Sequence, residues 1–320
     1  MIKKILLFTS LFILICLFVV PWLIPVGSAQ KAAEIPTPFP ESQTVDIYGT
    51  VIHYRHWEPR PMASEQKAPV LLVHGFSGST FSYRNMIPAL QAQGHRVVAV
   101  DLPAFGYSDR EIRAHQLPDA LLCLFLMLQH EPTQPWIVMG HSMGASVVSD
   151  IAAAYPRVVS ARVLIDGVPQ LRPGNSGIGG IFTTAFFRRW ASILGKYYFF
   201  TSNRIQSLLA SAYGPEVAPT TADVNGYLEP LLLPGTAEAI LKKFRYASAV
   251  QAKAAPENIP TLLIWGEFDS WIPIRVGESY HQKHPNTQWT VISGAGHNPM
   301  ETHPDTCNAV ILDFIANQNL

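Results

Sequence analysis

The chain has 320 residues, and 23 Lys and Arg residues balance 23 Asp and Glu residues, so its formal net charge is zero. This balance argues against a protein that binds nucleic acid through a cationic surface. A hydrophobic content of 48% excludes a disordered chain. The length suits one large α/β domain with an insertion, or two small domains.

The N-terminal segment, residues 1–29, contains an apolar run. Residues 5–24 carry no charged side chain and follow Lys3 and Lys4. As one helix this run would span about 30 Å, the thickness of a bilayer core, which predicts an N-terminal transmembrane helix that anchors the chain to a membrane. Small residues at 27–29 leave a cleaved signal peptide as the alternative. A buried core helix is disfavoured because the run has no polar face.

The two lysines before this run favour the cytoplasmic side of a membrane. We therefore expect the catalytic body to be extracytoplasmic, either membrane-anchored or, after signal cleavage, secreted or periplasmic. Residues 30–43 follow, with Pro36, Pro38 and Pro40 at alternate positions. Such spacing favours an extended, semi-rigid conformation, so this stretch is predicted to be a linker.

The body begins with two alternating stretches around Tyr48-Gly49-Thr50, which predict a β-hairpin. Apolar runs typical of buried strands alternate with helical patterns after it. The expected strands are 70–75, 95–103, 136–141, 161–169, 261–267 and 287–294, and the expected helices are 81–93, 117–130, 142–156, a stretch between the last two strands, and 305–317. This alternation predicts an α/β fold whose central sheet is mostly parallel and flanked by helices.

One segment interrupts the alternation. Residues 170–256 contain no buried-strand pattern; they begin with a Gly-rich loop at 172–180 and continue with broken helical patterns rich in aromatic residues. We expect a helical cap inserted between two strands of a core made of residues 44–169 and 257–320. An aromatic cap suits an apolar substrate, although the same aromatic residues could simply pack the cap onto the core. Arg188 and Arg189 could face a substrate carboxylate, but solvated arginines are the more ordinary outcome.

The strongest local motif is Gly140-His141-Ser142-Met143-Gly144, which fits G-x-S-x-G between an expected strand and an expected helix. In such a turn the side chains two residues either side of the serine would collide, so glycine is needed at both positions. Ser142 would then be exposed at the edge of the sheet and at a helix N-terminus, whose dipole stabilises developing negative charge. The alternative is a serine that only caps the helix.

A serine nucleophile needs a base and an orienting acid. Asp269 and His297 each follow an expected strand, so with Ser142 they can meet at one edge of the sheet. Asp166 also follows a strand and is the alternative acid. Glu267 is a weaker candidate, for which a surface hydrogen bond is the ordinary explanation.

These motifs together resemble the α/β-hydrolase superfamily from about residue 44 to the end of the chain. The order serine, aspartate, histidine is that of the superfamily. HGFSGS at 74–79 resembles its oxyanion loop, and DLPAFGYSD at 101–109 resembles another of its segments, with Ala104 where glycine is usual. The motifs imply an oxyanion hole formed by the backbone N–H groups of Phe76 and Met143.

The resemblance implies a serine hydrolase that cleaves carboxylic esters and needs neither a metal nor an organic cofactor. The apolar anchor and the aromatic cap are similar to the layout of membrane-anchored monoacylglycerol lipases, which implies a small-molecule or lipid ester substrate. C–C bond hydrolases, lactonases and cofactor-free peroxidases share the motifs and stay open. Dehalogenases and epoxide hydrolases are disfavoured because they use Asp where this chain has Ser142. A non-catalytic binding protein is the remaining alternative, and it predicts a damaged triad. The motifs name no protein partner.

Overall fold

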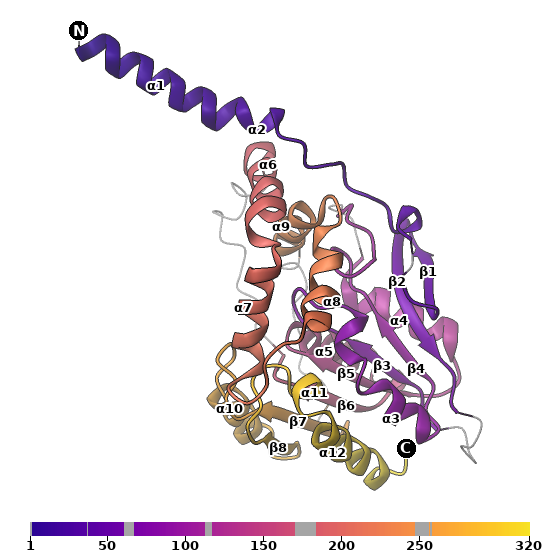
Figure 1. The fold of residues 1–320 in the computed structure, drawn as a ribbon. Helices are drawn as coiled ribbons and strands as arrows, with labels where there is room; N and C mark the ends of the chain where they lie inside the picture. The colour runs from indigo at the N-terminus through magenta and orange to yellow at the C-terminus, as the bar shows by residue number, and fades with distance from the viewer. Residues whose placement is uncertain are drawn as a thin grey trace.

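An eight-stranded sheet lies at the centre of the structure, a computed structural model that describes residues 2–36, 38–60, 67–112, 117–169, 184–246, 256 and 258–320. Its strand order is β1-β2-β4-β3-β5-β6-β7-β8 (Figure 1). The first hairpin and the β2–β4 pair are antiparallel, and all the other pairs are parallel, which confirms a mostly parallel sheet. The strands are β1 (Ser42–Ile47), β2 (Thr50–Trp57), β3 (Val70–Val73), β4 (Val97–Val100), β5 (Trp136–His141), β6 (Val159–Ile165), β7 (Thr261–Gly266) and β8 (Gln288–Ile292).

The first hairpin turns within the three residues that the sequence indicated, Tyr48, Gly49 and Thr50. Ile47 pairs with Thr50, and the intervening Tyr48 and Gly49 have φ angles of 51° and 81°. Two consecutive positive φ angles are typical of the tight turns whose twist matches that of the adjoining strands.

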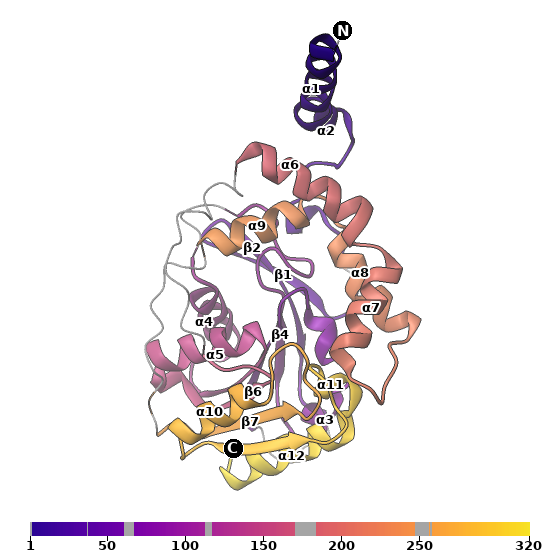
Figure 2. The same ribbon diagram turned by 90° about the vertical axis from the view of Figure 1, so that its left-hand side faces the viewer.

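Two helical layers cover the sheet. On one face lie α3 (Ile87–Ala92) and α12 (Pro304–Asn317), and on the other lie α4 (Asp119–His130) and α5 (Met143–Ala154) (Figure 2). Alternate residues of β3 serve the two layers: Val70 and Leu72 pack with the first pair of helices, and Leu71 and Val73 with the second. Because both faces are buried, these strands are continuously apolar in sequence.

Five further helical elements lie in this part of the described chain. They are the 3₁₀-helices η1 (Ala32–Glu34), η2 (Thr80–Tyr83) and η3 (Pro156–Val158) and the α-helices α10 (Arg275–Lys283) and α11 (Pro299–Thr302). The helix expected over 81–93 is therefore shorter than the sequence pattern suggested, since η2 and α3 divide that stretch. Pro88 lies in the first turn of α3, where the absence of its N–H costs nothing.

The helices between β6 and β7 form a layer over one edge of the sheet. They are α6 (Ala185–Leu194), the π-helical turn η5 (Gly195–Phe199), α7 (Ser202–Tyr213), α8 (Thr221–Leu232) and α9 (Thr236–Tyr246). Buried side chains of α7 and α8, among them Ile205, Leu209 and Leu228, make a small apolar core of their own. The Gly-rich loop expected at 172–180 lies outside the described residues.

The N-terminal apolar run forms two helices where one was expected. α1 (Ile2–Phe18) is followed by α2 (Val20–Leu23), with Pro21 in the first turn of α2. A proline inside one continuous helix would remove a backbone hydrogen bond and clash with the preceding turn, so the division falls here. Within the described residues we find no helix with both the length and the apolar character needed to cross a membrane.

This N-terminal segment contacts the cap through α6 (Figure 1). The Phe18 and Phe186 rings stack with centroids 4.7 Å apart. Arg189 Nε donates a hydrogen bond to the carbonyl oxygen of Pro21 at 2.8 Å, and Arg188 pairs with Glu238 at 2.9 Å. Both arginines are therefore engaged by groups of the protein itself.

Candidate active site

Ser142 occupies a strained turn between β5 and α5, with φ 50° and ψ −114°. A Cβ atom on Gly140 would lie 2.3 Å from the carbonyl oxygen of Gly144, and one on Gly144 would lie 2.1 Å from that of Val73. Neither position can therefore hold a side chain. The Ser142 N–H donates to the carbonyl oxygen of Ile165 at 2.8 Å, which fixes the turn against the neighbouring strand.

The structure brings Ser142, His297 and Asp269 together in one hydrogen-bonded chain. His297 Nε2 lies 3.0 Å from Ser142 Oγ, and His297 Nδ1 lies 2.7 Å from Asp269 Oδ2. Asp269 Oδ1 accepts from the N–H groups of Trp271 and Ile272 at 2.8 and 2.9 Å. Backbone donors therefore hold the carboxylate, the carboxylate orients the imidazole, and the imidazole faces the serine hydroxyl.

Two further side chains fix His297, and sequence reasoning did not assign them this task. His141 Nε2 donates to the carbonyl oxygen of His297 at 2.7 Å, and the Trp271 ring stacks on the imidazole with centroids 5.3 Å apart. Burial and the adjacent His297 place the pKa of His141 well below its usual range, so His141 is a neutral support. Their only sequence signal is proximity, since each lies within two residues of a triad member.

The two expected oxyanion donors belong to segments on either side of Ser142. Met143 is the first residue of α5, and an N–H in the first turn has no acceptor within the helix. A Cβ atom on Gly75 would lie 3.1 Å from Ser142 Cβ, so the backbone that leads into Phe76 passes directly beside the serine. The Phe76 ring lies against Phe105, with centroids 5.6 Å apart.

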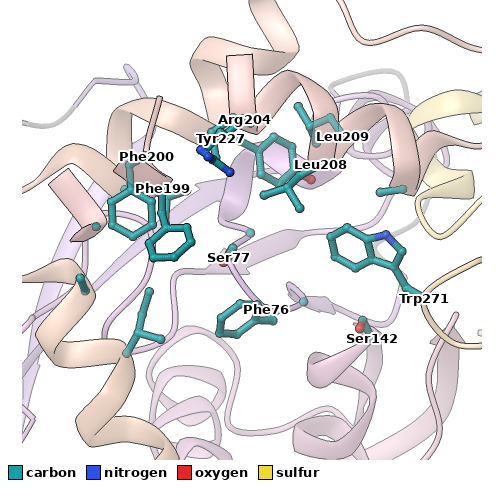
Figure 3. Close-up of a pocket in the computed structure, with 18 of the residues that line it drawn as sticks. Phe76, Ser77, Ser142, Phe199, Phe200, Arg204, Leu208, Leu209, Tyr227 and Trp271 are labelled. Carbon is teal, nitrogen blue, oxygen red and sulfur yellow. The ribbon is translucent and has the colours of Figure 1, made fainter. Parts of the chain in front are cut away.

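A cavity of about 920 Å³ opens above Ser142. Figure 3 shows Phe76 and Ser142 facing the labelled cap side chains across this space. Most of the lining is apolar, and the cap contributes Phe187, Trp190, Leu194, Phe199, Phe200 and Leu208. Ser142 and His297 line one end of the cavity, which is suited to chemistry, and the cap side is largely apolar but also carries Arg204 and Ser207 of α7.

A buried polar network connects the cap to the loop that carries His297. Glu301 accepts from Arg84 Nη1 at 2.6 Å and from Asn298 Nδ2 at 2.7 Å, and the Tyr227 hydroxyl also donates to it. Arg84 reaches Asp223 of α8 as well. Because Asn298 follows His297 and Tyr227 belongs to α8, this network joins the position of the base to that of the cap. The sequence gives no periodic signal for it.

The alternative acids lie elsewhere in the site. Asp166 is fully buried and Oδ1 accepts from the Gly266 N–H at 2.8 Å. Glu267 is exposed and accepts from the Ser293 hydroxyl at 2.7 Å, as expected for a surface hydrogen bond. Asp166, Asp269 and His297 each have one potential metal-ligand atom, and these three atoms lie within 4.8 Å of one another, a spacing that a metal ion could use. His297 Nδ1 is already hydrogen-bonded to Asp269 Oδ2 at 2.7 Å, so we interpret these two residues as part of the chain that ends at Ser142.

Comparison with known proteins supports the same fold. The profile of the α/β hydrolase fold family matches residues 68–304. The chain is 28% identical over 284 residues to the uncharacterized hydrolase YugF of Bacillus subtilis, covering 85% of this chain and 96% of that protein. It is 26% identical over 279 residues to epoxide hydrolase 4 of Mus musculus, covering 79% and 74% of the two chains.

Solved structures of other proteins have the same fold. An α/β hydrolase fold protein from Burkholderia ambifaria superimposes with a TM-score of 0.68 at 22% identity, covering 86% of this chain and 98% of that one. An esterase from Thermogutta terrifontis gives a TM-score of 0.64 at 21% identity, covering 87% and 97%. At these identities the likeness establishes the fold. With a family profile that matches more than half of its length, the chain belongs to the α/β-hydrolase fold family and is a hydrolytic enzyme.

Proposed function

We propose that this enzyme is a serine hydrolase that cleaves carboxylic esters with apolar acyl groups, such as monoacylglycerols, by acyl transfer. The observation that carries the proposal is the hydrogen-bonded chain from Asp269 through His297 to Ser142, which ends in a largely apolar cavity. A nucleophile within reach of a base, and a base oriented by an acid, is the arrangement that acyl transfer requires.

In the proposed reaction, His297 Nε2 takes the proton of Ser142 Oγ as the oxygen attacks the ester carbonyl. The backbone N–H groups of Phe76 and Met143 stabilise the resulting oxyanion, and each such donor contributes about 3 kcal/mol to lowering the barrier. His297 then gives its proton to the leaving alcohol. A water molecule, activated by the same imidazole, hydrolyses the acyl-enzyme and restores Ser142. Asp269 keeps Nδ1 protonated throughout.

A serine nucleophile favours esters over epoxides, although some relatives are named epoxide hydrolases. A carboxylate that opens an epoxide forms an ester, which water can hydrolyse at its carbonyl. Ser142 would form an ether, which has no carbonyl and would leave the enzyme blocked. The chemistry of Ser142 therefore supports acyl transfer for this chain.

The cavity supports an apolar acyl group. Phe199, Phe200 and Leu208 line its cap side, where most of the lining is apolar although Arg204 and Ser207 also face the cavity. Each methylene group moved from water into such a site contributes up to about 0.8 kcal/mol, or nearly fourfold in kcat/KM. A volume of about 920 Å³ accommodates one acyl chain more readily than three, which favours monoacylglycerols over triacylglycerols.

We also propose that the N-terminal segment attaches the enzyme to a membrane, with the catalytic body outside the cytoplasm. Support comes from the uncharged run at residues 5–24 behind Lys3 and Lys4, and from α6, which contacts this segment and also lines the cavity. Protease added outside the cytoplasmic membrane should cut the linker at residues 30–43 and release an active body. A mature chain that begins at Gln30 would indicate a cleaved signal and a secreted or periplasmic enzyme.

The substrate proposal is tested with p-nitrophenyl esters from acetyl to palmitoyl and with mono-, di- and triacylglycerols. We expect kcat/KM to rise with chain length from acetyl and then to level off when the cavity is full, and monoacylglycerols to be the best glycerides. Ser142→Ala is the control for background hydrolysis. A maximum at acetyl, or turnover only of lactones, C–C bonds or peroxide substrates, would overturn the lipid ester and leave the triad chemistry standing.

A further inference from the structure

Asp166 lies beside Asp269 and His297 but is not a member of the hydrogen-bonded chain that joins Asp269, His297 and Ser142. It follows β6, where Ile165 pairs with His141, and its backbone is in the left-handed region with φ 44°. A non-glycine residue is rarely held there, and such strain persists only where surrounding contacts fix it. The residue is fully buried, and one of its carboxyl oxygens lies within 4.8 Å of a carboxyl oxygen of Asp269 and of a ring nitrogen of His297.

The two carboxyl groups differ in the donors that they receive. Asp269 accepts from two backbone N–H groups and faces His297 Nδ1. Asp166 Oδ1 accepts from one backbone N–H group, and Asp166 Oδ2 has no hydrogen-bond donor among the described residues. Two buried carboxylates this close cannot both be ionised without strong repulsion. The donors favour the negative charge on Asp269 and therefore the proton on Asp166.

The titratable groups that we find beside Asp166 in the described structure are Asp269, His297 and Cys307, and His141 packs against His297. None of these groups is a lysine or an arginine that would offset the repulsion. Burial lowers the pKa of His141 and raises the pKa of the Cys307 thiol, so both are neutral near pH 7. His297 directs Nδ1 to Asp269. Burial and the charge of Asp269 raise the pKa of Asp166 well above its usual range.

We propose that Asp166 is a positioning residue: a protonated carboxyl group that donates a hydrogen bond from Oδ2 to Asp269 and holds Asp269 against His297. This inference rests on the proposed function, because it assigns Asp269 the task of orienting the base. A neutral acid suits this place. It supplies the remaining donor to Asp269 and adds no second charge, so the imidazole still faces a single carboxylate.

The test compares Asp166→Asn with Asp166→Leu in the full-length chain, with Asp313→Asn as a control that removes an exposed carboxylate. Asparagine keeps a neutral donor, so we expect kcat/KM for p-nitrophenyl butyrate within about threefold of wild type and an unchanged acidic limb of the pH profile. Leucine has similar bulk but no donor, so we expect kcat to fall about tenfold or more while KM stays within about twofold.

An ionised Asp166 predicts a different result. Its replacement by Asn would then remove a negative charge near the base, and the acidic limb would move to lower pH by about one unit. That shift would overturn the proposal, and so would a Leu variant with the kcat of wild type.

Infrared spectroscopy provides a measurement that needs no turnover. Wild type should show the carbonyl stretch of a buried protonated carboxyl group, and this band should be missing from Asp166→Asn and present in Asp313→Asn. Its absence from wild type would overturn the proposal even if the Leu variant fails to fold. If wild type shows the band but hydrolyses no ester, the proposed function fails while the protonation of Asp166 stands.

Discussion

The two walls of the cavity are built differently. On the core side, Ser142, Asp269 and His297 follow strands of the sheet and are held by backbone hydrogen bonds and close glycine contacts. On the cap side, Phe199 and Leu208 line the cavity with about half of their surface exposed. A rigid wall keeps reacting atoms within hydrogen-bond distance, whereas an adaptable apolar wall selects by size and hydrophobicity.

The walls meet at the network of Glu301, Tyr227 and Arg84. This network is largely buried and polar, whereas most of the cap lining is apolar, and it reaches the residue that follows His297. The comparison therefore predicts that core substitutions remove turnover, whereas cap substitutions change which ester is preferred.

The largest expected effect is that of Ser142→Ala. Removing the nucleophile should lower kcat by about 10⁵-fold or more and abolish covalent labelling by a fluorophosphonate. The fold should persist, because alanine fits the turn that Gly140 and Gly144 make possible. Circular dichroism and thermal unfolding check the fold. Labelling that persists in this variant would show that the nucleophile is another residue and that the chemistry does not belong to the core side of the cavity.

Asp269→Asn should follow, with a loss in kcat of about 10⁴-fold. The amide of asparagine can donate an N–H to His297 Nδ1, which stabilises the tautomer with its proton on Nε2, so the imidazole can no longer accept the Ser142 proton. Steady-state kinetics with p-nitrophenyl butyrate measures the loss. The outcome opposed to this expectation is a mild effect here together with a severe effect in Asp166→Asn, which would make Asp166 the orienting acid.

A third prediction concerns stability and separates Asp166 from the ionised acid beside it. The pKa of Asp166 is raised in the folded state, whereas an unfolded aspartate titrates near about 3.9. Between these values the folded chain binds one more proton, so its free energy of unfolding decreases as pH rises, by up to about 1.4 kcal/mol per pH unit. Below the pKa of the unfolded aspartate, the stabilising contribution of the Asp166 proton to the free energy of unfolding is fully present.

Asp166→Asn has no such proton to bind. Urea unfolding from about pH 5 to about pH 8 should therefore show the variant gaining stability relative to wild type as pH rises. Asp313→Asn should show no such trend, since that carboxylate is exposed. A constant difference between wild type and Asp166→Asn across this range would mean that Asp166 is ionised in the folded enzyme.

The smallest expected effect is in the cap. Leu208→Trp adds volume inside the cavity, so the preferred acyl chain should become shorter, and kcat/KM for long-chain esters should fall about tenfold while acetyl esters are unaffected. Leu128→Trp is a matched control, because Leu128 is an exposed leucine of α4 outside the cavity lining. Equal losses for short and long esters would show that the cap side also controls the chemistry.

Much of the fold could be predicted from the sequence alone. Continuous apolar runs located the five strands β3 to β7, because a strand buried on both faces is mainly apolar, whereas β8 is a largely exposed edge strand. The hairpin turn was visible because Gly49 interrupts two stretches of alternating apolar and polar residues. The order of Ser142, Asp269 and His297 was visible too, since each follows a strand and parallel strands end at one edge.

Tertiary structure decided what depends on contacts between distant parts of the chain. Two local divisions, of the apolar run at Pro21 and of the stretch 81–93, were missed for another reason, because hydrophobicity does not encode backbone geometry. The support of His297 by His141, and the network that joins Glu301 to Tyr227, require residues far apart in sequence to meet.

The same is true of the two aspartates. Asp166 and Asp269 each follow a strand, so their positions in the chain do not distinguish them. The number of donors that each carboxyl group receives distinguishes them, and that number is set by which backbone amides the fold turns toward each one. A charge is stable in the interior only where several donors converge, and such convergence exists only after the chain has folded.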